Sequence, residues 1–141
     1  MANGWRTLQT IGWQHSEPVL RSLAYALLER DGGNPANNDY EADRPGRSNL
    51  QTLKKIRTGW RHGKTEPQAS KELLNVLRQG SWQDACNKVI ALLNREVDPQ
   101  SLWDALFQHA AEMMMRRPAI VALHACTTTN ALHYLYEHSS N

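Results

Sequence analysis

The sequence predicts an all-α protein, an antiparallel bundle of five to seven helices. Three observations support this prediction. Apolar residues recur every three to four positions along most of the chain, which is the period of an amphipathic helix. No strand-like alternation of useful length is present. Proline and glycine stand near the expected helix ends. With 141 residues, of which 40% are hydrophobic, the chain is expected to form a single helical domain with a real core, possibly as a piece of a longer protein.

The first part of the chain contains one firm helix and one long loop. Residues 1–14 mix tryptophans with aliphatic residues, and we expect a short helix or an extended arm there. Ser16 is a suitable N-cap and Pro18 fits a first helical turn, which predicts a helix that ends near residue 31. Residues 31–48 are rich in Gly, Pro, Asn and Asp, so we interpret them as a long loop, either a lid or a tolerated surface insertion.

The middle of the chain predicts two shorter helices. Ser48 can cap a helix at about 49–60, whose end is loosened by glycines. The next helix, at about 66–79, has a complete apolar stripe and stops at Gly80.

The two helices that follow have clearer N-terminal capping residues in the sequence. Ser81 with Asp84 forms a capping box for one of them. Asp98 can cap the other, with Pro99 at the first helical position. The second of these helices carries apolar residues on two sides, so we expect it to be central.

The last predicted helix, residues 117–136, is the most unusual stretch. It begins with Pro118 and contains no further Gly or Pro. Three consecutive threonines and Asn130 interrupt a run that is otherwise apolar on all sides. Because these polar residues are small and uncharged, the pattern predicts a buried helix whose polar groups face a site.

His124, Thr127 and Thr128 share one face of this helix, since they are spaced three and four positions apart. Histidine is the natural proton acceptor near neutral pH, and a threonine one turn away can orient a substrate carbonyl. The alternative is that the threonines only hydrogen-bond to carbonyls of their own helix.

Three histidines offer a second interpretation of the same region. His109 and His124 lie at similar distances before and after the break at residues 117–118, and His15 precedes the first firm helix. If they converge, they would suit a metal ion or a haem iron. No tight ligand spacing such as H-x₃-H is present, so an isolated core histidine is the alternative.

The basic stretch and the absence of phosphate-binding motifs limit which classes of ligand we expect. Residues 44–64 hold seven Lys or Arg and no acid, which we interpret as a solvated helix face rather than a nucleic-acid site. Neither G-x-G-x-x-G nor G-x₄-G-K-[ST] occurs, which argues against a self-contained dinucleotide fold.

Cys86 and Cys126 are expected to be reduced and to pack as small apolar residues. With no long apolar run and no signal peptide, we expect a cytoplasmic protein without membrane contact.

Two stretches resemble the questin oxidase-like family. The run Arg117-Pro-Ala-Ile-Val-Ala-Leu-His-Ala-Cys-Thr-Thr is similar to a family segment that leads into H-x-x-T-[ST]. The run His15-Ser-Glu-Pro-Val-Leu-Arg-Ser-Leu-Ala-Tyr25 is similar to a His-Pro-rich segment that ends in Leu-Gly-Tyr. The chain departs from the family where it has Ser22 in place of a second histidine and in the separation of His15 from Pro18. It is also shorter than family members.

The resemblance implies an oxidoreductase that performs a Baeyer–Villiger-type oxidation with NADPH as reductant. It points to His124, Thr127 and His15 as catalytic residues. We therefore expect a hydrophobic aromatic carbonyl or quinone to bind between the first, fifth and sixth firm helices. The expected substrate-binding residues are Thr128, Trp103, Phe107, His109 and Tyr25.

Two alternatives come from other classes of protein. One is a haem- or metal-binding helical bundle that uses the three histidines. The other is a non-catalytic helical interaction module, packed against missing parts of a longer chain or against a second copy.

Overall fold

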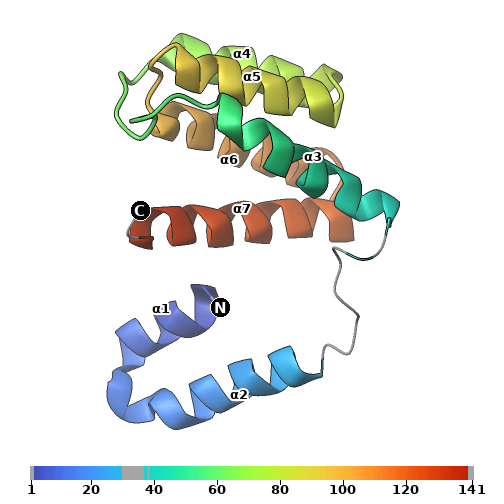
Figure 1. Cartoon of the computed structure of the whole chain (residues 1–141). Coiled ribbons are helices and arrows are strands. Elements are labelled where there is room, and N and C mark those ends of the chain that lie inside the picture. The colour runs from blue at the N-terminus through green and yellow to red at the C-terminus, as the bar shows by residue number, and fades with distance from the viewer. Residues whose placement is uncertain (1, 30–36, 38, 140–141) are drawn as a thin grey trace. The chain divides into compact units, whose positions relative to one another are not determined.

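A computed structural model describes residues 2–29, 37 and 39–139 of the chain. Within these residues it contains seven α-helices, a few short 3₁₀ turns and no strand, which confirms the predicted all-α class. The chain divides into two compact units. Unit 1 comprises Met1–Asp39 and Asn130–Asn141, and unit 2 comprises Tyr40–Thr129 (Figure 1).

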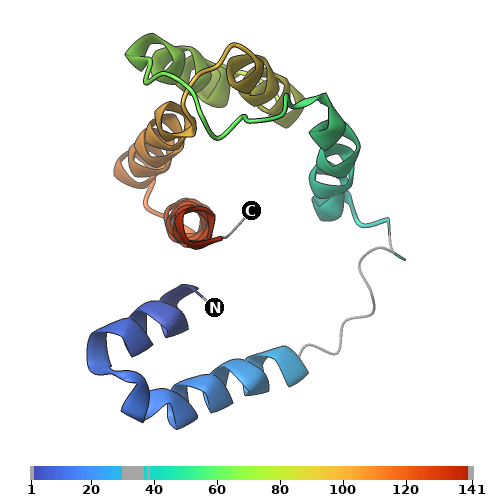
Figure 2. The ribbon, with the colours of Figure 1, turned by 60° about the vertical axis from the view of Figure 1, so that its left-hand side comes forward.

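Three helices form the body of unit 2: α4 (Pro67–Gln79), α5 (Trp82–Asn94) and α6 (Pro99–Arg116). Helix α4 packs on both α5 and α6 (Figures 1 and 2). The predicted start signals of α5 and α6 are confirmed, because the Ser81–Asp84 capping box is complete and Asp98 caps α6 ahead of Pro99. Their apolar faces meet in a core made of Ala69, Leu73, Leu74, Leu92, Leu93, Val97, Leu102 and Ala105.

Helix α3 (Arg44–Thr52) and the 3₁₀ turn η4 (Leu53–Lys55) lead into this body. The predicted boundaries, a loop up to residue 48 and a helix at 49–60, are wrong. Pro45 lies in the first turn of α3, where its missing N–H needs no acceptor, so the helix starts earlier than Ser48. It ends earlier too, since Ile56 is extended and Gly59 has a φ of 70°. Most of the remaining predicted loop lies outside the described residues.

The segment that follows η4 is fixed to the α5–α6 turn by backbone hydrogen bonds. Lys64 donates its N–H to the carbonyl of Glu96 at 2.8 Å, and Asp98 donates to the carbonyl of Lys64 at 2.9 Å. Gly63 makes this approach possible, because a Cβ at this position would lie 2.5 Å from the carbonyl oxygen of Glu96.

Arg57 strengthens the same connection from inside the basic stretch. Its guanidinium donates to the carbonyls of Leu93 at 2.9 Å, His62 at 2.6 Å and Thr58 at 3.3 Å. Its backbone N–H donates to the side chain of Asn94 at 2.8 Å. Arg57, which the sequence grouped with a solvated charged face, therefore links the segment after η4 to the end of α5 through hydrogen bonds.

Ion pairs connect the helices of unit 2 at its surface. Arg78 of α4 donates to both carboxylate oxygens of Glu112 on α6. This hydrogen bond lowers the pKa of Glu112 to about 2. On the α4–α5 side, Arg95 lies 3.1 Å from Glu66 and 3.2 Å from Glu72.

Unit 1 consists of α1 (Ala2–Ile11), the 3₁₀ turn η1 (Trp13–His15), α2 (Ser16–Leu28) and the end of α7 (Ile120–His138). The first residues thus form a helix rather than an extended arm. Leu8 is fully buried, and Tyr134 of α7 is 5% exposed. The hydroxyl of Tyr134 donates to Gln9 at 2.6 Å, and the Arg6 guanidinium lies 4.4 Å from the centre of its ring. No described helix is long and apolar enough to cross a membrane.

Candidate functional site

The predicted site residues of α7 lie together on one side of the helix, which we call the outer face. It carries His124, Thr127 and Thr128, all of them exposed. Large aliphatic side chains flank these residues on the same face. Their exposed fractions are 64% for Ile120, 66% for Val121, 52% for Leu132 and 45% for Leu135. The structure therefore places His124, Thr127 and Thr128 together, as the sequence predicts.

The prediction that this helix is buried is wrong for His124, Thr127 and Thr128, which are exposed, whereas Leu135 lines a pocket with Ala2 and Trp5 of unit 1. The thiol of Cys126 donates to the carbonyl of Ala110 on α6 at 3.3 Å. At about 100° per residue, His124 points about 160° away from Cys126 around the helix axis. Tyr134 lies about 20° from Thr127 around the helix axis, and its hydroxyl contacts Gln9 of α1 within unit 1. The periodicity of apolar residues shows which side chains share a helix face, but it does not show whether another part of the protein covers that face.

Thr127 makes the hydrogen bond that the alternative interpretation expected. Its hydroxyl donates to the carbonyl of Leu123 at 3.0 Å, one turn back in the same helix. The hydroxyl oxygen can still accept a hydrogen bond, but its proton is engaged. As a group that orients a carbonyl oxygen by donation, Thr127 is therefore weaker than predicted.

His109 sits in different surroundings from His124. It is half-buried on α6, and its Nδ1 atom is buried without a hydrogen-bond partner among the described residues. Because His124 faces away from α6, the structure does not bring the two imidazoles to a shared ligand.

The other predicted site residues are spread over both units. Trp103 and Phe107 are half-buried on α6 in unit 2. His15 and Tyr25 are exposed and belong to unit 1. The described residues contain no cluster of three or more His, Cys, Asp or Glu side chains that could hold a metal ion.

Unit 2 contains an apolar pocket that the sequence did not predict, which we call the α3 pocket. It has a volume of about 310 Å³ and lies between α3 with η4, α4, α5 and α6. A few polar groups interrupt its aliphatic walls: the Asn49 amide, the Thr52 hydroxyl and the Cys86 thiol. Aliphatic side chains supply the rest of the lining: Leu53, Ile56, Leu73, Leu77, Ala85, Val89, Ile90 and Leu106.

Most of these lining residues belong to the apolar stripes that the sequence predicts. What the stripes could not show is that the packing of α3 on α5 leaves space between them. Thr52 donates its hydroxyl to the Asn49 carbonyl at 3.0 Å, so among these groups the amide of Asn49 is the better donor to a ligand. Cys86 and Cys126 are both free thiols and half-buried.

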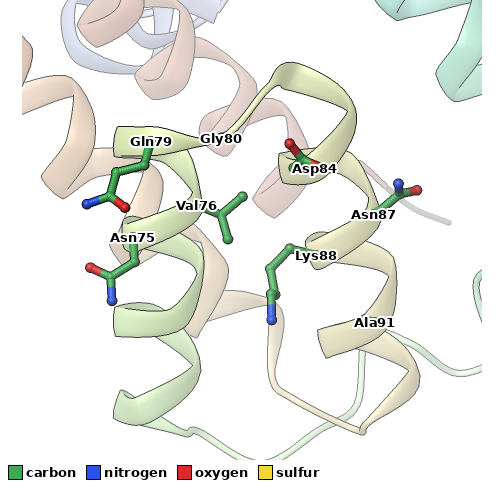
Figure 3. A pocket seen from close by; sticks show the side chains of 8 residues that line it. All are labelled: Asn75, Val76, Gln79, Gly80, Asp84, Asn87, Lys88 and Ala91. Atoms are coloured by element: carbon green, nitrogen blue, oxygen red, sulfur yellow. The ribbon is translucent and has the colours of Figure 1, made fainter.

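A second groove lies between α4 and α5 (Figure 3). The amide side chains of Asn75, Gln79 and Asn87 line it, together with Asp84 and Lys88. Its volume of about 610 Å³ would admit a nucleotide.

The chemistry of this groove does not fit NADPH, the reductant that the resemblance implies. A dinucleotide carries phosphates that need cations or free backbone N–H groups. The cation lining the groove, Lys88, lies 3.5 Å from Glu72 in an ion pair. Asp84 adds negative charge, and its carboxylate is already bonded to Ser81.

Comparisons of the chain with protein families, with curated proteins and with solved structures found no match.

Proposed function

We propose that the chain binds a small hydrophobic aromatic carbonyl compound, such as a quinone, and that the α3 pocket is the binding site. The observation that carries this proposal is the pocket itself. Its volume of about 310 Å³ lies at the lower end of the range for small-molecule sites. Its apolar walls favour the transfer of a flat hydrophobic ring out of water.

The polar groups of the pocket decide which ring compound fits best. A hydrocarbon would leave the Asn49 amide without an acceptor, whereas a carbonyl oxygen can accept its N–H. No lysine, arginine or carboxylate lines the pocket among the described residues, so a charged ligand would lose its hydration without compensation. A neutral aromatic ring with one or two carbonyl groups satisfies both conditions.

Calorimetric titration of the purified chain with 1,4-naphthoquinone tests this proposal. Ala85→Leu adds three carbon atoms to the pocket wall, and we expect it to weaken binding at least tenfold. Ala91→Leu is the matched control, because Ala91 lies on the same helix but is exposed in the α4–α5 groove. Both variants should give the helical circular dichroism of the parent chain. Equal affinity in the parent and in Ala85→Leu, or no binding at all, would refute the proposal.

Oxygenation of such a ligand is a second proposal, and it is supported by the resemblance of the two motifs. One atom of dioxygen would be inserted beside a carbonyl group, and the other would leave as water with two electrons from NADPH and two protons. Any such activity would use the imidazole of His124 as acid or base on the outer face of α7. His124 does not line the α3 pocket, so this reaction would act on a quinone at the outer face and not on one held in the pocket, and the two proposals are tested separately. His124→Ala should abolish consumption of the quinone and leave its affinity unchanged. Unchanged turnover in this variant would refute the oxidoreductase proposal and would leave the binding proposal unaffected.

A further inference from the structure

Unit 1 contains an apolar pocket of its own, which we call the unit 1 pocket. It has a volume of about 520 Å³, within the range for small-molecule sites. Side chains from three helices form its walls: Trp5 of α1, Leu20 and Leu23 of α2, and Leu135 of α7. Trp5, Leu20 and Leu135 are 45%, 42% and 45% exposed. Because they converge on one cavity, a ligand seated there would remove all three from water at once.

The wall of this pocket also carries aromatic rings that are already held in place. Tyr134 and His138 of α7 stack with their ring centres 4.0 Å apart. Tyr134 is almost completely buried, so it gives the imidazole of His138 a fixed support. The ring of Trp5 meets that of Trp13 edge-on, with 4.9 Å between the ring centres. A flat aromatic ligand can therefore pack on rings that need little ordering when it binds.

His138 also presents a hydrogen-bond acceptor to the pocket. Its Nδ1 atom lies 2.8 Å from the backbone carbonyl oxygen of Tyr134. Because a carbonyl oxygen can only accept a hydrogen bond, Nδ1 carries the proton. In the neutral imidazole the free lone pair is then on Nε2, to which no described residue donates. His138 is exposed, so this acceptor lies at the rim of the pocket.

The other polar features of the pocket restrict the ligand further. No lysine, arginine or carboxylate lines it among the described residues, so a charged ligand would lose its hydration without compensation. The hydroxyl of Ser139 donates to the carbonyl of Tyr136 at 3.3 Å, so its proton is engaged. A ligand that only accepts hydrogen bonds would shield Nε2 of His138 from water without supplying a donor. The best ligand is therefore neutral and aromatic, with an N–H or O–H group at one edge.

We propose that the unit 1 pocket binds a neutral aromatic compound with one hydrogen-bond donor, such as an indole, whose N–H donates to Nε2 of His138. This chemistry differs from that of the α3 pocket, where the amide of Asn49 favours a ligand that accepts a hydrogen bond. The two pockets belong to different units and share no lining residue. The inference is independent of quinone binding in the α3 pocket, and either can fail without the other.

Calorimetric titration of the full chain with indole tests the proposal. Every sample carries Ala85→Leu, which narrows the α3 pocket, so that the heat reports on unit 1. Leu20→Glu places a carboxylate in the wall of the unit 1 pocket, and we expect it to weaken binding at least tenfold. Leu27→Glu is the matched control, because Leu27 lies on the same helix and is 60% exposed but does not line the pocket. The absence of indole binding, or equal affinity in the two glutamate variants, would overturn the proposal.

A comparison of two ligands tests the hydrogen bond to His138. 1-Methylindole keeps the ring system of indole but has no N–H, and His138→Phe keeps an aromatic ring but has no acceptor. This variant should weaken indole binding about three- to tenfold, the usual effect of one lost hydrogen bond, and leave 1-methylindole unaffected. His138 is exposed at the end of α7, so helical circular dichroism should not change. If both ligands lose affinity equally, or neither does, the assigned acceptor and ligand class are wrong.

Discussion

Gly63→Ala should destabilise unit 2 strongly, although it adds a single methyl group. The new Cβ would lie 2.5 Å from the carbonyl oxygen of Glu96 and 2.6 Å from the backbone N of Asp98. Those backbone groups form hydrogen bonds with Lys64, and they cannot move away without breaking them. Two lost backbone hydrogen bonds cost about 2 kcal/mol together, and the remaining overlap adds roughly 1–2 kcal/mol. We therefore expect the free energy of unfolding to fall by about 3 kcal/mol.

Urea denaturation followed by circular dichroism measures this change. With a slope of about 1.5 kcal/mol per molar urea, the midpoint should fall by roughly 2 M. Gly46→Ala is the control, because nothing lies within 4 Å of a Cβ at Gly46 in α3. Alanine is a better helix former than glycine, so this variant should gain up to about 1 kcal/mol. If Gly63→Ala is as stable as the parent chain, the steric reasoning about the α5–α6 turn is wrong.

Further predictions concern other contacts of unit 2. Because the hydrogen bond from Arg78 lowers the pKa of Glu112 from 4.5 to about 2, the pair adds stability above pH 4.5 that is lost as the pH falls toward 2. Glu112→Gln should remove this part of the acid dependence in urea titrations, and an unchanged pH slope would contradict it. Ser81→Ala breaks the capping box of α5 and should cost about 1 kcal/mol, which thermal unfolding would show as a lower midpoint. Arg57→Lys loses most of the carbonyl contacts of the guanidinium and should cost about 2 kcal/mol in the same assay, whereas Lys54→Ala, at an exposed position, should have little effect.

The helices with strong local start signals could be predicted well from the sequence. The capping box at Ser81 and the Asp98-Pro99 pair place α5 and α6 within a residue, because such signals act through neighbours in the chain. The start of α3 was missed because Ser48 was assigned as the N-cap, whereas the helix begins at Arg44. Pro45, which the sequence suggested was a loop residue, is instead in the first turn.

The candidate site was harder to predict, for two physical reasons. Periodicity correctly grouped His124 with Thr127 and Thr128 on one face, but burial depends on contacts with distant segments. The α3 pocket depends on how closely α3 approaches α5, and no pattern within either helix records that distance. The role of Arg57 was hidden for the same reason, since its acceptors include a carbonyl at the end of α5 that only the folded chain brings near.

Unit 1 is built from the two ends of the chain, and this has a consequence for the order of folding. The hydrogen bond between Tyr134 and Gln9 joins residues 125 positions apart. Closing a flexible loop of that length costs about 4 kcal/mol in chain entropy. If Tyr40–Thr129 folds first, most of this loop is already compact and the cost falls. The ends of the chain should therefore associate late and separate first, and amide protons of α1 should exchange with solvent faster than those of α4.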